Sequence, residues 1–266
     1  MQTIKSLIFD MDGVLWKDDT PLGDMQMIFH QLQSQNIQYT FATNNSTKSA
    51  VDYQIKLNKF GIPSKKEQII TSAITLAKML VDKFPEGGPV HILGETGLRE
   101  ALLENGFHHQ DHNVLAFVGG LDTQITYEKL KNATLLLAQN TAFYYTNSDT
   151  NFPAPEGNIP GAGSILRALE AGSGRQAIVA GKPKPTMFEY AMQAINAAPE
   201  STLVIGDRLD TDILGGLQAK CLTALVLTGI STQADLDRST YKPHLVFDNL
   251  SKLLDFLIRS DWKINS

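Results

Sequence analysis

Short runs of hydrophobic residues alternate along the chain with longer stretches in which hydrophobic residues recur at helical spacing. The short runs are rich in β-branched and aromatic residues and predict strands at Ser6–Phe9, Gln38–Ala42, Val90–Leu93, Val114–Val118, Ala142–Thr146, Ala177–Ala180, Thr202–Ile205, Ala224–Leu227 and Leu245–Phe247. The longer stretches predict helices at Met25–Gln35, Ala50–Phe60, Ser72–Lys83, Thr126–Gln139, Gly163–Ala171 and Thr186–Ala197. This alternation is typical of α/β proteins with a parallel sheet.

The predicted strands differ in the residues that follow them. Glycines follow the strands that end at Leu93 and Val118. Polar or charged residues follow the strands that end at Phe9, Ala42, Ala180 and Ile205. Two kinds of strand indicate two modules. We therefore expect a doubly wound, mostly parallel α/β core at residues 1–78 and 177–266, interrupted by an inserted α/β cap at residues 79–176.

Composition narrows the classes of protein that the chain can belong to. It has 266 residues, of which 42% are hydrophobic, enough for a sizeable core. The formal net charge of −5 gives no basic surface for nucleic acid or an anionic membrane. No segment approaches the roughly 18 apolar residues of a membrane helix, and the first apolar run is too short for a signal peptide. One cysteine, Cys221, excludes an internal disulfide framework, so we expect a soluble, cytoplasmic protein.

Four strand ends carry chemically active side chains, within the segments "FDMDG", "FATNNS", "AGKPKP" and "IGDRLDTD". The side chains are Asp10, Asp12, Thr43, Asn44, Asn45, Lys182, Asp207, Asp210 and Asp212. A turn explains any single segment, because Asp, Asn and Gly favour turns. In parallel α/β sheets, however, ligands bind beyond the carboxyl ends of the strands, so four such ends together favour one site.

The residue types in these segments suggest phosphoryl chemistry. Carboxylates that meet at one point repel one another unless a cation neutralises them, and oxygen ligands suit Mg²⁺. A lysine, a threonine hydroxyl and backbone amides would bind a tetrahedral dianion, of which phosphate is the obvious example. Asp10, at the very end of its strand, would then be placed to attack phosphorus.

The four segments occur in the order of the motifs of a known family. "DMDGVLW", "TNNST", "GKPKP" and "GDRLDTDI" resemble the four motifs of the haloacid dehalogenase (HAD) superfamily of phosphohydrolases. The chain is most similar to its NagD-like subfamily of nitrophenyl phosphatases and pyridoxal phosphate phosphatase, which carry a large α/β cap between the second and third motifs. Matching segments such as "TNSDTNFP" and "VLTGIST" extend the resemblance over nearly the whole chain.

The resemblance implies a role for each motif residue. Asp10 would be the nucleophile that forms an aspartyl-phosphate, and Asp12 the general acid and then the general base. Mg²⁺ would be held by Asp10, the backbone carbonyl of Asp12 and Asp207, with Asp212 either as a further ligand or as a partner of the ligands. The phosphate would be bound by Thr43 and Lys182, with Asn44 and Asn45 shaping the turn and reaching the substrate. The resemblance also implies a homo-oligomer paired through the cap.

Several alternatives stay open at this point. Asp12 favours a phosphate ester over a haloacid, because a halide leaves without a proton and an alcohol needs one. A phosphotransferase or mutase would use the same aspartyl-phosphate, and a non-catalytic protein could sense phosphorylated metabolites with the same fold. The substrate of the favoured phosphatase would be a small phosphate ester.

Other residues have two readings each. Specificity residues or simple turn residues are equally good interpretations of Gly119, Gly120, Asp122, Asn147 and Asp149. The segment "HHQDH" at residues 108–112 contains metal-ligand types, but we expect a solvated loop there. Lys184 is a rival of Lys182 that we expect to face solvent, and Trp16 fits either the core or the entrance of the site.

Overall fold

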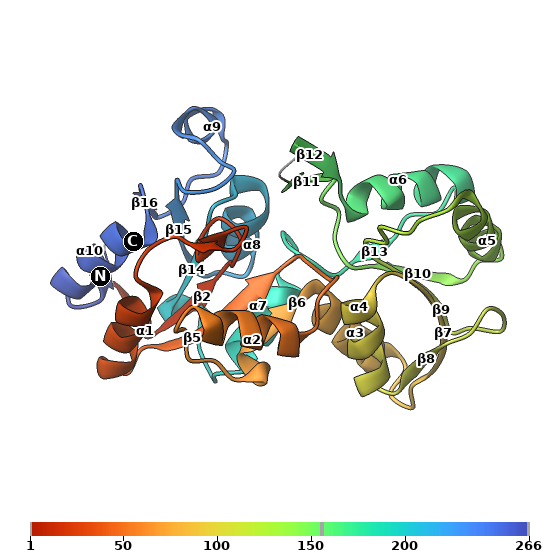
Figure 1. Cartoon of the computed structure of the whole chain (residues 1–266), viewed down its shortest axis with the longest axis horizontal. Helices are drawn as coiled ribbons and strands as arrows, with labels where there is room; N and C mark the ends of the chain where they lie inside the picture. The colour runs from red at the N-terminus through yellow and green to blue at the C-terminus, as the bar shows by residue number, and fades with distance from the viewer. Residues whose placement is uncertain (1, 155–156, 265–266) are drawn as a thin grey trace. The chain divides into compact units, whose positions relative to one another are not determined.

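The chain forms two compact α/β units in a computed structural model that describes residues 2–154 and 157–264. The first unit consists of Met1–Thr43, Val51–Ile70 and Lys182–Ser266. The second unit consists of Asn44–Ala50 and Thr71–Gly181. Each unit is built around its own sheet with helices on both faces (Figure 1). The predicted fold class, a parallel α/β core with an inserted α/β module, is confirmed.

The sheet of the first unit has six strands in the order β16-β15-β14-β2-β5-β6. They are β2 (Ser6–Phe9), β5 (Gln38–Thr43), β6 (Ile69–Thr71), β14 (Thr202–Gly206), β15 (Leu222–Val226) and β16 (Leu245–Phe247). β2 runs parallel to both β5 and β14, with Leu7 opposite Leu203 and Phe9 opposite Phe41. The carboxyl ends of β2 and β14 therefore lie side by side, which brings the residues after them together.

The helices of the first unit cover both faces of this sheet. They are α1 (Met25–Ser34), α2 (Ala50–Lys59), α7 (Thr186–Gln193), α8 (Leu214–Gln218), α9 (Gln233–Arg238) and α10 (Leu250–Arg259). Phe9 packs against Phe29 of α1, with ring centroids 5.3 Å apart, whereas its neighbour Ile8 packs in a cluster with Phe188 of α7. A strand that is buried on both faces needs a continuous apolar run, which is why β2 reads "SLIF".

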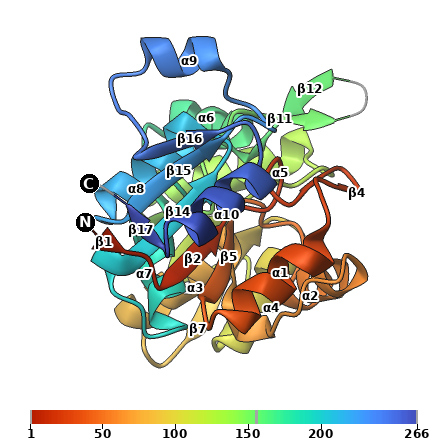
Figure 2. The same cartoon turned by 90° about the vertical axis from the view of Figure 1, so that its left-hand side faces the viewer.

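Short elements complete the first unit. They are β1 (Gln2–Thr3), β3 (Trp16–Lys17), β4 (Thr20–Pro21), β17 (Lys263–Ile264), the 3₁₀ turns η1 (Lys66–Gln68) and η2 (Pro199–Ser201), and the π-helical turn η3 (Leu209–Ile213). β1 pairs antiparallel with β17, so the two ends of the described chain lie next to each other (Figure 2). β3 and β4 form a small hairpin directly after Asp12.

The sheet of the second unit has five strands in the order β13-β10-β9-β7-β8. They are β7 (Gly88–Leu93), β8 (Phe107–His109), β9 (Ala116–Gly119), β10 (Ala142–Tyr145) and β13 (Ile178–Val179). The helices are α3 (Ser72–Lys83), α4 (Thr96–Glu104), α5 (Tyr127–Ala138) and α6 (Ala162–Ser173), and β11 (Asn151–Ala154) pairs with β12 (Gly157–Pro160).

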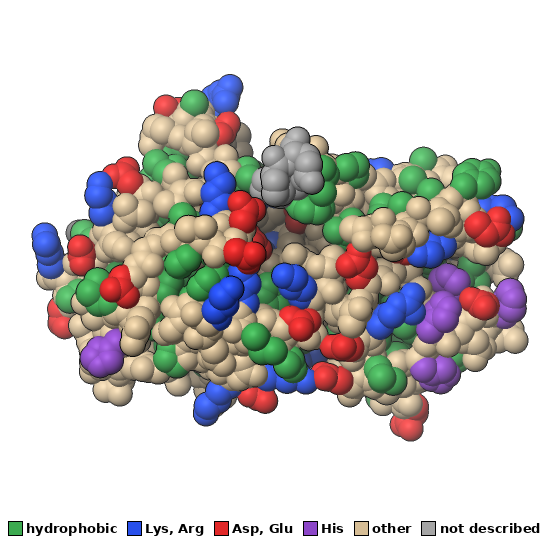
Figure 3. All heavy atoms as spheres, in the orientation of Figure 1, with side chains coloured by type: hydrophobic (Ala, Val, Ile, Leu, Met, Phe, Trp, Pro, Cys, Tyr) green, Lys and Arg blue, Asp and Glu red, His purple; other side chains and the backbone are tan. Residues whose placement is uncertain are grey.

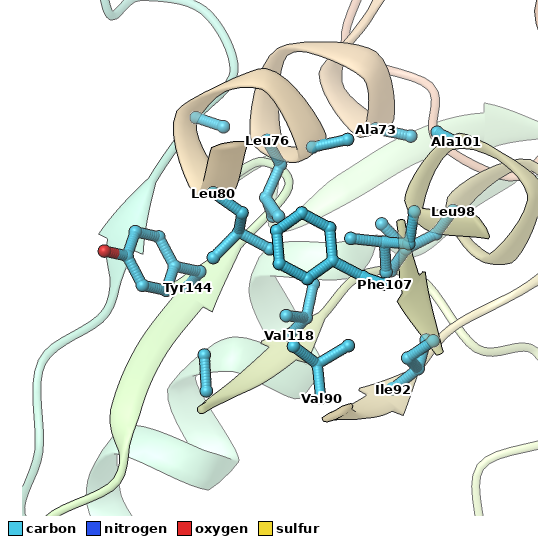
Figure 4. Packing of buried hydrophobic residues seen from close by; sticks show 14 residues of the cluster. Ala73, Leu76, Leu80, Val90, Ile92, Leu98, Ala101, Phe107, Val118 and Tyr144 are labelled. Atoms are coloured by element: carbon cyan, nitrogen blue, oxygen red, sulfur yellow. The ribbon is translucent and has the colours of Figure 1, made fainter. Parts of the chain in front are cut away.

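Alternating residues of these strands face two separate hydrophobic clusters. On one face, Leu80 of α3 and Leu98 of α4 pack with Val118 of β9 (Figure 4). On the other face, Phe117 packs with Leu137 of α5 and with residues of α6. Two covered faces again explain why β9 and β10 are apolar throughout.

The limits of the second unit differ from the predicted cap limits of 79 and 176. α3 packs on the sheet of the second unit, so the longer stretch of this unit begins at Thr71. The predicted strand at Ala177–Ala180 forms β13, which pairs with β10, and the backbone N–H of Ala180 donates to the carbonyl of Tyr145 (2.9 Å). This strand therefore lies in the second sheet and not in the predicted core, because hydrogen bonding to β10 decides its place.

Candidate active site

Three aspartates from distant parts of the sequence meet at the carboxyl ends of the strands of the first unit. Asp10 follows β2, Asp207 follows β14, and Asp212 lies in the π-helical turn after Asp207. One carboxylate oxygen of each lies within 4.8 Å of those of the other two. The parallel register of β2 and β14 explains why residues so far apart in sequence come together, as the sequence predicts.

Lys182 joins two of these aspartates. Its Nζ donates to Oδ1 of Asp10 (2.5 Å) and to Oδ1 of Asp212 (2.6 Å). A third bond goes to the backbone carbonyl of Ala42 at the end of β5 (3.0 Å). Lys184 is exposed, so Lys182 and not its rival is the lysine that the structure places among the carboxylates.

Asp207 is held in a narrow space that two glycines create. The backbone N–H of Ile230 donates to its Oδ2 (2.7 Å). A Cβ atom on Gly13 would lie 2.6 Å from this oxygen, and one on Gly229 would lie 1.9 Å from it. Gly13 also has a φ of +82°, which favours glycine. A side chain at either position would collide with the carboxylate of Asp207. The glycine in "DG" after β2 is therefore required by the site as well as by the turn.

The charges of the cluster are not balanced by the protein. Burial and the charges of Asp212 and Asp207 raise the pKa of Asp10 well above its usual range, although Lys182 opposes the shift. Burial, with the charge of Asp212, raises the pKa of Asp207 to about 7. Burial opposes the charge of Lys182, but Asp10 and Asp212 outweigh it and raise the pKa of Lys182. The charges of Lys182 and Arg208 oppose the shift at Asp207, yet burial and the neighbouring carboxylate outweigh them, so the gathered negative charge is unfavourable.

A divalent cation would neutralise this negative charge. The gathered ligand atoms of Asp10, Asp207 and Asp212 are all carboxylate oxygens, the donor type that hard cations such as Mg²⁺ prefer. These three side chains fit such an ion. The predicted ligand role of the Asp12 carbonyl stays a prediction.

Asp12 and Thr43 have partners that the sequence did not reveal. Oδ1 of the exposed Asp12 accepts a hydrogen bond from Nε1 of Trp16 (2.8 Å). The buried hydroxyl of Tyr53, on α2, is hydrogen bonded to the side chain of Thr43. Burial, then the charges of Asp12 and Asp10, raise the pKa of Tyr53. Tyr53 and Leu57 share the apolar spacing of α2, so in the sequence Tyr53 cannot be told from a core residue.

Asn44 and Asn45 belong to the second unit, where both are engaged within the chain. Nδ2 of Asn44 donates to Oδ2 of Asp149 (2.9 Å), and Asn147 donates to the same oxygen (2.9 Å). Oδ1 of Asn45 accepts from the backbone N–H of Thr47 (2.9 Å), which caps a turn. Their predicted contact with substrate stays a prediction.

Three other candidates of the second unit have packing or turn roles. A Cβ atom on Gly119 would lie 2.2 Å from the ring of Tyr145, and one on Gly120 would lie 3.0 Å from the hydroxyl of Thr146. The buried Asp122 accepts from the backbone N–H of Gln124 (2.9 Å) and pairs with a lysine of α5. Close packing accounts for Gly119 and Gly120 and a turn accounts for Asp122, and a role in specificity stays a prediction.

The histidine segment is not simply the expected loop. Phe107–His109 forms β8, and β8 pairs with β7 so that His109 lies beside His91, with ring centroids 5.0 Å apart. Figure 3 shows histidine side chains gathered on the second unit. Oδ1 of Asp111 lies 3.4 Å from Nε2 of His109 and 3.8 Å from Nδ1 of His91. Strand pairing therefore brings His91 to His109, although the two residues are 18 positions apart in sequence.

A hydrogen bond decides what His109 can do. Nδ1 of His109 accepts from the backbone N–H of Ile92 (3.0 Å). This bond puts the proton of the neutral imidazole on Nε2, which then faces Asp111 and has no lone pair for a metal. His109 thus satisfies a backbone donor just beyond the pairing of β7 with β8, and its Nε2 lies 3.4 Å from Oδ1 of Asp111. The arrangement favours a structural role over metal ligation.

Comparisons with known proteins agree with this architecture. Residues 7–108 match the family described as haloacid dehalogenase-like hydrolase, and residues 179–253 match one described as HAD-hydrolase-like. An acid sugar phosphatase of Staphylococcus saprophyticus is 32% identical, over 96% of this chain and 98% of the relative. A 5′-nucleotidase of Bacillus subtilis is 30% identical, over 97% of this chain and 100% of the relative.

Solved structures show the same likeness. A 4-nitrophenylphosphatase from Thermotoga maritima has a TM-score of 0.90 and 35% identity, over 95% of this chain and 97% of that one. A glycerol phosphate phosphatase from Mycobacterium tuberculosis, solved in complex with magnesium, has a TM-score of 0.86 and 29% identity, over 95% of this chain and 79% of that one.

The parallel sheet with an acidic cluster at its strand ends, together with an inserted α/β unit, defines a two-unit α/β hydrolase. The chain belongs to the haloacid dehalogenase-like hydrolases, in the group that includes NagD and the nitrophenyl phosphatases. Among the described residues, no helix is both long and apolar enough to cross a membrane.

Proposed function

We propose that this protein is a Mg²⁺-dependent phosphatase that hydrolyses phosphomonoesters of small metabolites through an aspartyl-phosphate on Asp10. One observation carries the proposal. Asp10 lies at the end of β2 with its carboxylate bonded to a buried lysine and close to two further aspartates. A carboxylate in this setting is held in place, and Lys182 partly screens its charge. With the two further aspartates it can also serve as a ligand of a divalent metal ion.

The reaction would proceed in two steps. In the first, a carboxylate oxygen of Asp10 attacks phosphorus, the bond from phosphorus to the ester oxygen breaks, and Asp12 gives its proton to the leaving alcohol. In the second, the Asp12 carboxylate takes a proton from water as that water attacks the phosphorus of the aspartyl-phosphate. Phosphate leaves, and Asp10 and the proton on Asp12 are restored.

The other residues would support these steps electrostatically. Lys182 would stabilise the charge that spreads over the phosphoryl oxygens in the transition state, and the Thr43 hydroxyl would bind one of these oxygens. Bound Mg²⁺ supplies positive charge that reduces the repulsion between the Asp10 carboxylate and the phosphate dianion. Asp207 and Asp212 would hold that ion, while Tyr53 keeps Thr43 in place.

The substrate class follows from what the relatives have in common. The names acid sugar phosphatase, 5′-nucleotidase and glycerol phosphate phosphatase share a phosphomonoester and differ in the alcohol. We propose a small phosphorylated metabolite of this kind as the substrate. Pairing of two copies through the second unit and a cytoplasmic location, which a single cysteine favours, stay predictions.

The test is phosphate release from a panel of sugar phosphates, nucleotides, glycerol phosphate and 4-nitrophenyl phosphate, with Mg²⁺ and with a chelator. We expect release with Mg²⁺ that the chelator abolishes. Asp10→Asn should reduce it by roughly 10⁴-fold or more, since removing a covalent nucleophile costs this much in other hydrolases. Asp210→Asn is the matched control, because Asp210 is exposed and pairs with Arg208.

The same experiment separates the alternatives. A phosphotransferase would release little phosphate in buffer but would transfer the group to an added alcohol. A sensor would bind an ester without turnover. Full activity in folded Asp10→Asn would refute the proposed nucleophile.

A further inference from the structure

The indole of Trp16 lies against the proposed general acid. Trp16 is fully buried, and its Nε1 donates to Oδ1 of Asp12 at 2.8 Å. An indole N–H is a donor and never an acceptor, so Oδ1 must act as the acceptor in this bond. When Asp12 is neutral, this bond favours the carbonyl form of Oδ1 and the proton on Oδ2, because a carbonyl oxygen is the better acceptor.

We propose that Trp16 is a positioning residue that orients the Asp12 carboxyl for proton transfer, an inference that rests on the proposed function. Asp12 itself is exposed, and the bond from the indole restrains its side chain. By occupying Oδ1, the indole leaves Oδ2 as the oxygen that gives the proton to the leaving alcohol. The same oxygen would later take the proton from the attacking water.

The surroundings of Trp16 hold the indole still. Nζ of Lys56 lies 4.5 Å from the centroid of the ring, and the ring of Phe60 packs at 5.7 Å. Lys56 is fixed in turn by the carbonyl of Asp18 (2.6 Å) and the carboxylate of Asp19 (3.3 Å). A positioning group is effective when its own side chain is locked by its neighbours.

Backbone hydrogen bonds also hold the turn between Asp12 and Trp16. The carbonyl of Trp16 accepts from the N–H of Gly13 (2.7 Å), and the N–H of Leu15 donates to the carbonyl of Met11 (2.8 Å). Asp12 and Trp16 are thus joined through main chain and side chain together. The turn between them is short and hydrogen bonded, so the distance from indole to carboxylate is built into the loop.

If the role of Trp16 is purely structural, its substitution should lower kcat/KM for all substrates alike. If Trp16 positions Asp12, the loss should depend on whether the leaving group needs a proton. Trp16→Phe keeps an aromatic ring for Lys56 and Phe60 and removes the N–H. We expect kcat/KM for glycerol phosphate to fall about tenfold, a part of the roughly 10²–10⁴-fold that general acid catalysis contributes. The leaving group of 4-nitrophenyl phosphate is nitrophenolate, which needs no proton. For this ester the expected loss of kcat/KM is therefore below about twofold.

The chain offers a matched control in its second tryptophan. The indole of Trp262 donates to the side chain of Gln35 at the other end of the first unit. Trp262→Phe removes the same kind of hydrogen bond and should leave the ratio of the two substrates unchanged. In an Asp12→Asn background, Trp16→Phe should cause no further loss with glycerol phosphate, because the group that it orients is gone.

A spectroscopic measurement covers the case in which Trp16→Phe does not fold. The chain has two tryptophans, so protein with ¹⁵N-labelled tryptophan gives two indole signals. Asp12→Ala should shift the Trp16 signal and leave the Trp262 signal in place, whereas no shift would overturn the contact. Equal losses for both esters in folded Trp16→Phe would overturn the positioning role. Failure of the proposed function would instead appear as activity that survives Asp10→Asn.

Discussion

Each unit of this protein brings together three side chains of metal-ligand type, but the two groups have opposite properties. The group in the first unit consists of buried carboxylates, Asp10, Asp207 and Asp212. The group in the second unit consists of His91, His109 and Asp111, of which the last two are exposed. We call them the aspartate cluster and the histidine cluster.

The difference lies in whether the protein itself satisfies the carboxylates of the first group and the two nitrogens of His109 in the second. In the aspartate cluster, burial and mutual repulsion raise the pKa of Asp207 to about 7, so a bound cation would relieve an existing cost. In the histidine cluster, the two nitrogens of His109 already face Ile92 N–H and Asp111. The presence of ligand-type side chains alone does not define a metal site; an unbalanced charge is also needed.

Among variants that test this comparison, Lys182→Met should have the largest effect on stability and activity. The substitution leaves Asp10 and Asp212 buried without their cation, and removing one partner of a buried ion pair costs about 3–5 kcal/mol of unfolding free energy. Loss of the charge at the phosphoryl group should also reduce kcat by about 10²–10³-fold. Denaturant unfolding without metal and phosphate release measure the two effects.

Lys184→Met is the control for this change. Lys184 is exposed two residues away, so its substitution should alter stability by less than about 0.5 kcal/mol. Mg²⁺ should restore part of the stability of Lys182→Met, because it supplies positive charge to the same carboxylates. Equal stability of the two variants without metal would show that Lys182 does not neutralise the cluster.

The next largest effect should be a change with pH in how much Mg²⁺ stabilises the protein. Folded Asp207 has a pKa of about 7 and so binds its proton more tightly than the unfolded chain does. In the metal-free protein, its contribution to the unfolding free energy is present below about pH 4 and is lost as the pH rises to about 7. Mg²⁺ competes with this proton, so the rise in Tm on adding Mg²⁺ should be larger at about pH 8 than at about pH 5.5.

Variants in the two clusters sharpen this test. Asp207→Asn should abolish the effect of Mg²⁺ on Tm, whereas Asp111→Asn in the histidine cluster should leave it unchanged. A Tm shift that depends on Asp111 would contradict the assignment of the metal site to the first unit.

The smallest effect should come from His109→Phe. The ring volume is kept, but the N–H of Ile92 loses its acceptor, which costs about 1 kcal/mol for a partly buried donor. His108 is exposed in the same strand, and His108→Phe leaves the bond from Ile92 to His109 in place, so it should cost less than about 0.5 kcal/mol. Neither should alter phosphate release, and equal costs would refute the structural role of His109.

The sequence predicts the aspartate cluster well because its geometry depends on strand ends. Asp10 and Asp207 directly follow strands that are adjacent and parallel, and the apolar runs reveal both strands. Lys182 is predicted by its motif although the strand before it belongs to the other sheet. Family resemblance therefore located Lys182 more reliably than the assignment of that strand did.

Contacts that depend on pairing or packing partners could not be predicted in this way. His91 meets His109 through the register of β7 and β8, and β8 has too few residues to show a strand pattern. Trp16 reaches Asp12 because a tight turn folds the chain back, and Tyr53 reaches Thr43 from the apolar face of a helix. In each case the residue type fits an ordinary core position until its partner is known.

The most direct test of the central claim is to trap the covalent intermediate. Protein turning over a phosphate ester with Mg²⁺ is quenched, and borohydride reduces an aspartyl-phosphate to homoserine, which peptide mass spectrometry locates. The account predicts homoserine at Asp10, and none there when Asp10→Asn is treated in the same way. Reduction at another carboxylate, or active wild-type protein without any reduced residue, would contradict it.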